Sequence, residues 1–172
     1  DASTRVIEEL GLQQGVVRVD VAVVNGLLHG YEIKSAADTL RRLPKQAQVY
    51  SAVLDRASIV VASNHLQHVI EIVPRWWEIL VATSDGEVVR FDREREGCEN
   101  PSIDKRALVE LLWHEETLRL LAAYDAAKGL ASKPRRVAWD RACEVVPVEE
   151  IRRTVRETLK ARVARRSAQS PC

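Results

Sequence analysis

Residues 16–35, VVRVDVAVVNGLLHGYEIKS, decide the fold of the N-terminal part of the chain. From residue 16 to residue 24 the odd positions are apolar, whereas Arg18 and Asp20 occupy even positions. This alternation is typical of a half-buried strand. Asn25-Gly26 then gives a strong hairpin signal, because both residues tolerate positive φ. The stretch therefore predicts a β-hairpin whose second strand covers residues 27–35.

The register of this hairpin decides which side chains share a face of the sheet. A three-residue loop of residues 24–26, with Gly26 in the left-handed region, puts the odd valines on the same side as Tyr31 and Ile33. Asp20, Glu32 and Lys34 then share the other side. A two-residue turn would separate Asp20 from Glu32 and turn one strand's apolar set away from the core. We therefore predict the three-residue loop, with an apolar odd face toward the core and two carboxylates and an ammonium on the even face.

The charged face suggests metal chemistry. Two neighbouring carboxylates repel one another unless one of them takes up a proton or both bind a cation. Mg²⁺ prefers carboxylate oxygens and water, and a nearby lysine can orient a metal-bound water or stabilise developing charge. The alternative is an ordinary ion pair on an exposed sheet face.

The same residues resemble a known signature. The spacing of Asp20, Glu32 and Lys34 is similar to the D…(D/E)xK pattern of the restriction-endonuclease-like PD-(D/E)XK nuclease superfamily, although no proline precedes Asp20. QAQVY, from Gln46 to Tyr50, resembles the QxxxY motif of RecB-like and Cas4-like nucleases. The longer stretches GYEIKSAADTLRRLPKQAQVY and VPRWWEI also resemble an uncharacterised bacterial and phage family of that superfamily.

The resemblance implies an α/β fold, a mixed central sheet flanked by helices, with a C-terminal helical extension. It implies a Mg²⁺- or Mn²⁺-dependent nuclease that hydrolyses DNA phosphodiester bonds in repair, defence or phage DNA processing. The implied metal ligands are Glu9, Asp20, Glu32 and the backbone of Ile33, with Glu9 on a predicted helix over residues 4–10 where Glu8 competes for the role. The implied catalytic residues are Asp20, Glu32, Lys34, Gln46 and Tyr50.

The rest of the chain divides into two regions, with a nuclease-like core over residues 1–100 and a helical, basic region over residues 101–172. In the core we expect a helix that begins at Pro44, a central strand, a short helix and a second hairpin at the sheet's edge. These last three cover residues 57–63, 64–72 and 79–91. The C-terminal region predicts three helices, over residues 102–127, 134–144 and 148–166.

Charge is distributed unevenly between the two regions. Residues 1–100 hold 11 lysines and arginines against 15 acidic residues, and residues 101–172 hold 15 against 10. A basic region beside an acidic one suits a DNA-binding protein, although a solvated surface helix is the alternative. The residues expected to contact nucleic acid are Arg41, Arg42, Lys45 and three side chains that we call the basic trio, Arg152, Arg156 and Lys160.

Composition restricts the cellular setting. The three cysteines are far apart and form no CxxC pair, and the chain has neither an apolar run of membrane-spanning length nor a signal-peptide pattern at residue 1. We expect a cytoplasmic protein without a membrane partner, and a homodimer is one possible assembly. Two other functions stay open, namely a catalytically silent nuclease fold that binds DNA or protein, and a ribonuclease.

Overall fold

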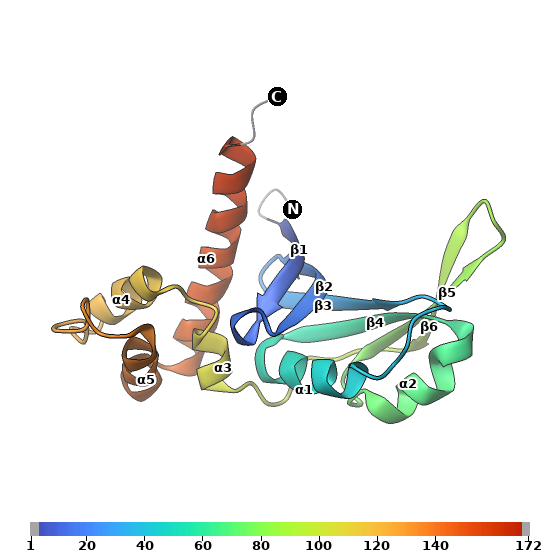
Figure 1. Ribbon diagram of the computed structural model, residues 1–172, viewed down its shortest axis with the longest axis horizontal. Coiled ribbons are helices and arrows are strands. Elements are labelled where there is room, and N and C mark those ends of the chain that lie inside the picture. Colours follow the sequence, from blue (N-terminus) through green and yellow to red (C-terminus); the bar gives the residue numbers. More distant parts are fainter. Residues whose placement is uncertain (1–3, 170–172) are drawn as a thin grey trace. The chain divides into compact units, whose positions relative to one another are not determined.

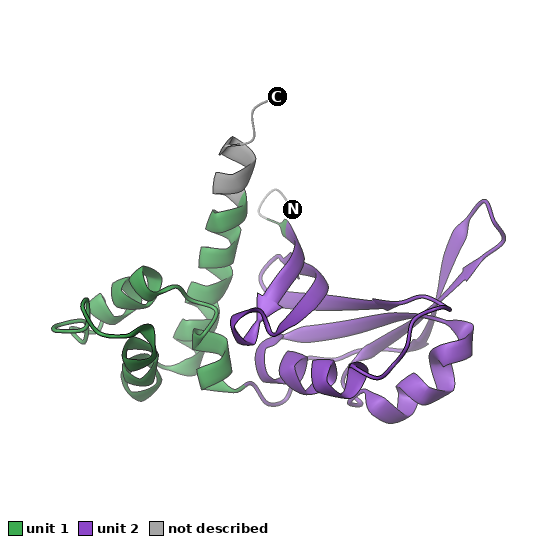
Figure 2. Cartoon of the chain, viewed as in Figure 1, with its two compact units in different colours: residues 1–5, 104–172 green, residues 6–103 purple. Residues whose placement is uncertain are grey.

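The computed structural model describes residues 4–169, and their side chains as far as residue 163. Figure 1 shows the order of the elements, and Figure 2 divides the chain into two compact units, residues 6–103 and residues 104–169 with residues 4–5. The boundary between the units follows residue 103, whereas the sequence predicted a boundary after residue 100. No helix in the described part of the chain is long and apolar enough to cross a lipid bilayer.

The first unit is built on a six-stranded mixed sheet in the order β1-β2-β3-β4-β5-β6. The pairs β2–β3 and β5–β6 are antiparallel, and β3–β4 and β4–β5 are parallel. Helices α1 and α2 lie along the same face of this sheet (Figure 1). The bounds of the strands are Arg5–Leu12, Val17–Val24, Leu28–Lys34, Arg56–Ala62, Glu78–Ser84 and Val89–Arg95, and those of the helices are Leu43–Val53 and Leu66–Ile72. The α/β class expected from the sequence is therefore confirmed.

The predicted helix over residues 4–10 is wrong, because this segment is strand β1. Its buried residues Leu10 and Leu12 are two apart, which is the period of a strand and not of a helix. Glu9 has a φ of +53°, so the strand departs from regular geometry at the residue expected to bind metal.

The β2–β3 hairpin has the predicted parity but a different loop. Val24 pairs with Leu28 and Val21 with Tyr31, so the loop consists of residues 25–27 and not of residues 24–26. Gly26 is now the second loop residue, and its φ of +119° is a conformation that favours glycine. The ladder pairs residues 21–24 with residues 28–31, and Asp20 lies beyond it. The position of Asp20 is fixed instead by the hydrogen bond that its Oδ2 accepts from the Ile33 N–H.

The prediction of which face is buried is wrong for β3. Its even residues, which include Glu32 and Lys34, are buried, whereas Tyr31 is half-buried and Ile33 is 51% exposed. Helix α1 explains this, because its side chains Gln46 and Tyr50 contact Glu32 on the even side. In β2 the buried positions change from odd to even at residues 20 and 21, so the valines of this strand do not form one face.

The second unit is helical, with α3 (Lys105–Val109), α4 (His114–Ala122), α5 (Arg135–Val145) and α6 (Val148–Gln169). The single helix predicted over residues 102–127 is wrong, because α3 and α4 are separate. Trp113 is extended, and its backbone N–H donates to the Glu116 carboxylate at 2.7 Å, which starts a new helix. The two later helices agree with the prediction, and Ile151, Val155 and Leu159 form the buried stripe of α6.

Candidate functional site

Glu32 is the centre of a buried polar cluster on the even side of β3. Its side chain is 1% exposed. Oε1 of Glu32 accepts hydrogen bonds from the Lys34 ammonium at 2.5 Å and from Nε2 of Gln46 at 2.6 Å, and Oε2 lies 2.5 Å from the hydroxyl of Tyr50. Lys34 follows two residues later on the same strand face, and Gln46 and Tyr50 are one turn apart on α1. The ExK and QxxxY residues are thus in direct contact.

Tyr50 connects this cluster to β2. Its hydroxyl oxygen also lies 2.6 Å from the backbone carbonyl oxygen of Arg18, so its one proton is shared between that carbonyl and Glu32. The Tyr50 ring stacks on Trp77 with centroids 5.6 Å apart. Burial raises the pKa of Tyr50, and its hydrogen bond to the Glu32 carboxylate and the negative charges of Glu32 and Asp20 raise that pKa further. Tyr50 therefore stays protonated and acts as a hydrogen-bond donor, not as a base.

The side-chain oxygen of Gln46 is a hydrogen-bond acceptor without a donor among the described residues. Because a carboxylate only accepts hydrogen bonds, the amide nitrogen of Gln46 must face Glu32. The amide oxygen is then buried without a hydrogen-bond partner among the described residues. A buried acceptor of this kind is costly unless a donor reaches it, so Gln46 has room for a hydrogen bond from a ligand or a water.

Asp20 reaches the cluster's opening from β2. Oδ2 of Asp20 accepts a hydrogen bond from the backbone N–H of Ile33 at 2.8 Å, which fixes this carboxylate beside β3. Asp20, Glu32, Lys34 and Gln46 all line one hollow of about 500 Å³. Its lining contains four basic side chains (Arg18, Lys34, Arg42 and Lys45) and four acidic ones (Glu9, Asp20, Glu32 and Asp38).

Glu9 also lines this hollow, and its partner there is Arg18. Its carboxylate is 3.5 Å from the Arg18 guanidinium, and both side chains are well exposed. Among residues whose side chains are described, no three histidine, cysteine or acidic residues are grouped as metal ligands. Of the acidic residues that line the hollow, Asp20 and Glu32 are the two that come from the hairpin strands β2 and β3.

Carboxylates are the kind of ligand that a small hard cation takes. Mg²⁺ and Mn²⁺ prefer oxygen donors, and Mg²⁺ usually binds one or two carboxylates and keeps several waters. Asp20 and Glu32 would hold the ion from neighbouring strands, with water filling the remaining positions from the hollow. The role predicted for the Ile33 backbone stays a prediction.

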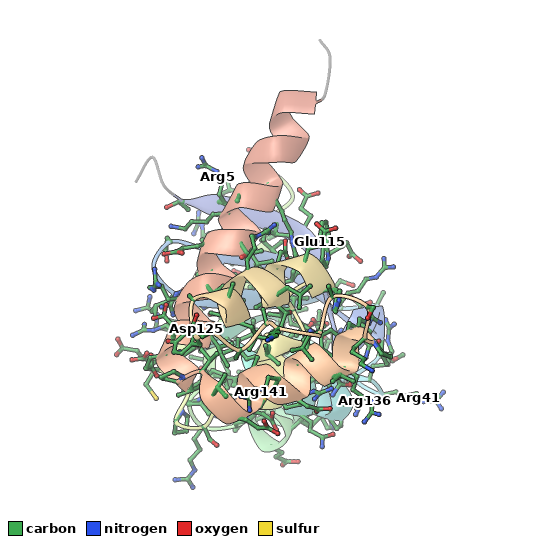
Figure 3. The ribbon with its side chains drawn as sticks, turned by 90° about the vertical axis from the view of Figure 1, so that its left-hand side faces the viewer. Arg5, Arg41, Glu115, Asp125, Arg136 and Arg141 are labelled. Carbon is green, nitrogen blue, oxygen red and sulfur yellow. The ribbon has the colours of Figure 1, made fainter. Side chains whose placement is uncertain are left out.

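The predicted nucleic-acid contacts fall into two groups. In the sheet unit Arg42 and Lys45 line the hollow, and Arg41 is exposed and extends into solvent (Figure 3). The basic trio lies on α6 in the helical unit, where Arg152 pairs with Glu149 at 3.0 Å and the other two members also have partners. The trio therefore takes part in contacts within the protein.

A second polar cluster, on the odd side of β3, was not singled out from the sequence. Oγ of Ser58 donates to Glu78 at 2.7 Å, so the Nε2–H of His29 must donate to Oγ of Ser58 at 2.8 Å. The Tyr31 hydroxyl lies 3.4 Å from the remaining nitrogen of His29, and the two rings stack. The signal that could have identified this cluster is the placement of His29 and Tyr31 two apart on one strand face.

The fold and the Glu32 cluster define an α/β protein with a polar site between the β2–β3 hairpin and helix α1, which follows it. The chain belongs to the family described as bacteriophage P4 protein cII, which matches residues 1–170. Protein cII of Enterobacteria phage P4 is 28% identical over 119 residues, or 69% of this chain. The chain matches 45% of the length of that curated relative.

One solved structure is also similar. The SPO1766 protein of unknown function from Silicibacter pomeroyi is 20% identical, with a TM-score of 0.41 over 77% of this chain and 87% of that chain.

Proposed function

We propose that this chain is a Mg²⁺- or Mn²⁺-dependent phosphodiesterase that acts on DNA. The observation that carries the proposal is the convergence of Asp20, Glu32, Lys34 and Gln46 on one hollow, with Tyr50 behind them. These are the residues that the D…ExK and QxxxY resemblance requires to meet, although they come from two strands and a helix.

Charge balance in the hollow supports a bound cation. With equal numbers of acidic and basic side chains in its lining, the hollow has little net attraction for a phosphate. A divalent cation between Asp20 and Glu32 would make the balance positive. When bound, the ion would lower the pKa of a water molecule and polarise the scissile phosphate.

The protein's own residues would then orient the reaction. Lys34 places a positive charge next to Glu32, where it can hold the attacking water and stabilise charge that develops on phosphate oxygens. Gln46 and Tyr50 hold the Glu32 carboxylate in place, and the spare acceptor of Gln46 can receive a hydrogen bond from that water. In hydrolysis the water oxygen forms a new P–O bond, the P–O bond to the leaving sugar oxygen breaks, and that oxygen takes up a proton, which leaves a phosphate end and a hydroxyl end.

Cleavage assays with the purified chain test this proposal. Single-stranded, duplex and branched DNA, and RNA in parallel, are incubated with Mg²⁺, Mn²⁺ or EDTA. The D20N variant keeps an acceptor for the Ile33 N–H, so it should fold normally but cleave on the order of 10²- to 10³-fold more slowly. E71Q, which changes an exposed carboxylate on α2, is the matched control and should cleave like the wild type.

A second candidate is a catalytically silent module that binds DNA or protein. It is favoured by the engagement of Glu32 with three donors, which satisfies that carboxylate without any metal. Binding of DNA without cleavage under every metal condition would support this candidate and refute the phosphodiesterase. Cleavage of RNA alone would support the ribonuclease.

A further inference from the structure

Strand β6 forms an exposed edge of the sheet. It is the last strand in the sheet order, and the β5–β6 hairpin extends beyond the other strands (Figure 1). Val89 and Phe91 are 55% and 59% exposed, although both are large apolar residues. Exposed edge strands pair readily with other strands, and natural proteins usually protect them with charge. Five of the seven residues of β6 are charged, so a strand that pairs with this edge must match its charge pattern and cover Phe91.

The sequence of β6 is complementary to itself. When two copies of a strand pair antiparallel about a twofold axis, opposite residues must point to the same side of the sheet. One residue then faces its own copy on the axis, and its neighbours face each other. With Phe91 on the axis, Arg90 of each copy faces Asp92 of the other, and Val89 faces Arg93.

Other registers of β6 are worse. Residues 90 and 92–95 are all charged, so placing any of them on the axis would oppose two identical charges. Only Val89 and Phe91 are uncharged in this strand. Val89 is its first residue, so a register with Val89 on the axis would pair only the ends of the two strands. The pattern Arg-Phe-Asp thus selects a single register, centred on Phe91.

The intramolecular contacts of β6 leave this register accessible. Arg93 and Arg95 bind residues of the same unit, through Glu78 at 3.0 Å and the carbonyls of Trp77 and Pro74. Arg90, by contrast, is 3.8 Å from Asp85, and both side chains are mostly exposed, so this contact is weak. Arg90 can therefore exchange Asp85 for a carboxylate on another strand.

We propose that two copies of this chain dimerise by antiparallel pairing of their β6 strands, centred on Phe91. A nucleic acid is a poor alternative occupant, because residues 84–96 hold five acidic residues against three arginines. The pairing joins the two sheets into one and covers Phe91 with its own copy. The proposal does not depend on the proposed function.

Charge reversal in the full-length chain tests the proposal by analytical ultracentrifugation. The wild type should be a dimer. R90D gives two carboxylates in each copy and D92R gives two guanidiniums, so each variant alone should dimerise on the order of 10- to 100-fold more weakly. An equimolar mixture of R90D and D92R restores both opposite-charge pairs and should form a mixed dimer. The matched control R136D reverses an exposed arginine on α5 (Figure 3) and should dimerise like the wild type.

Several results would overturn the proposal. One is a wild-type chain that stays monomeric at concentrations up to about 1 mM, the weak end of the affinity scale. Another is a dimer that R90D and D92R leave unchanged, and a third is a mixture of the two that associates no better than its components. Circular dichroism of each variant shows whether it is folded, and F91K, which places like charges on the axis, provides an independent disruption.

Discussion

Replacing Lys34 by methionine should destabilise the sheet unit strongly, because it breaks a buried ion pair. The Lys34 and Glu32 side chains are 7% and 1% exposed, and their charged atoms are 2.5 Å apart. Removing one partner leaves the other charge buried, and such losses typically cost about 3–5 kcal/mol. Gln46 and Tyr50 still donate to Glu32 in K34M, which favours the lower end of that range. If the two residues formed an ion pair on an exposed sheet face, the alternative given by the sequence, its loss would cost at most about 1 kcal/mol.

A double variant separates the charge effect from packing. In E32Q/K34M neither charge remains. The new amide oxygen can accept the hydrogen bond from Gln46, and the new NH2 can donate to the Tyr50 hydroxyl oxygen, whose own proton then goes to the Arg18 carbonyl. Replacing a whole buried ion pair is often neutral, so the double variant should recover most of the loss and lie within about 1–2 kcal/mol of the wild type. R18M, which removes the cation of the exposed Arg18–Glu9 pair, is the matched control and should change stability by less than about 1 kcal/mol.

Native-state hydrogen exchange at the amides of β3 measures the opening free energy of this unit separately from the helical unit. A K34M chain whose β3 amides open with a free energy within about 1 kcal/mol of the wild type would refute the reasoning. So would a double variant that is less stable than K34M. Either result would mean that the Glu32 carboxylate does not depend on the ammonium beside it.

Three further predictions concern other parts of the chain. Burial lowers the pKa of His29, and the nearby Arg56 lowers it too while Glu78 opposes them, so the unfolded chain binds a proton that the folded chain does not. Stability should therefore fall as pH drops below about 6.5, and urea titrations of H29Q should show a smaller fall than the wild type. G30A should cost about 1–3 kcal/mol in the same assay, because a Cβ there would lie 2.4 Å from Leu54, whereas G11A, which meets no atom closer than 3.4 Å, should cost less. Replacing the basic trio with alanines should reduce the log–log salt slope of duplex DNA binding by about 0.9 for each lost phosphate contact, and an unchanged slope would mean that α6 does not contact DNA.

The sequence predicted which residues would meet but not which side of the strand would be buried. The parity of residues 21–24 against residues 28–31 follows from local pattern, because Asn25-Gly26 marks the turn. The change of buried side at residues 20 and 21 of β2 does not follow from that pattern. The buried side depends on where α1 packs, and α1 comes from a separate segment. Because Glu32 and Lys34 are charged, the sequence predicted that they lie on the face away from the core. Helix α1 covers that face instead, and its residues Gln46 and Tyr50 form hydrogen bonds with the Glu32 carboxylate.

Two helical predictions failed for local reasons. RVIEEL can place its apolar residues on a helix or on a strand, and pairing in the sheet decided in favour of β1. The apolar stripe from residue 108 to residue 122 continues through the extended residue Trp113, so periodicity alone could not show the break. The capping contact with Glu116 was the available signal, since an acidic residue three positions after a helix start is typical of a new N-terminus.

Strand β3 carries a polar cluster on each side, with Glu32 and Lys34 facing α1 and His29 and Tyr31 facing Ser58 and Glu78. One residue inserted within this strand would exchange the two sides beyond the insertion and separate both sets of partners. One residue inserted at positions 25–27 would only lengthen the loop, which has no role in either cluster. When relatives of this chain are aligned, differences in length should therefore gather at the hairpin tip, and the seven positions from Leu28 to Lys34 should align without a gap.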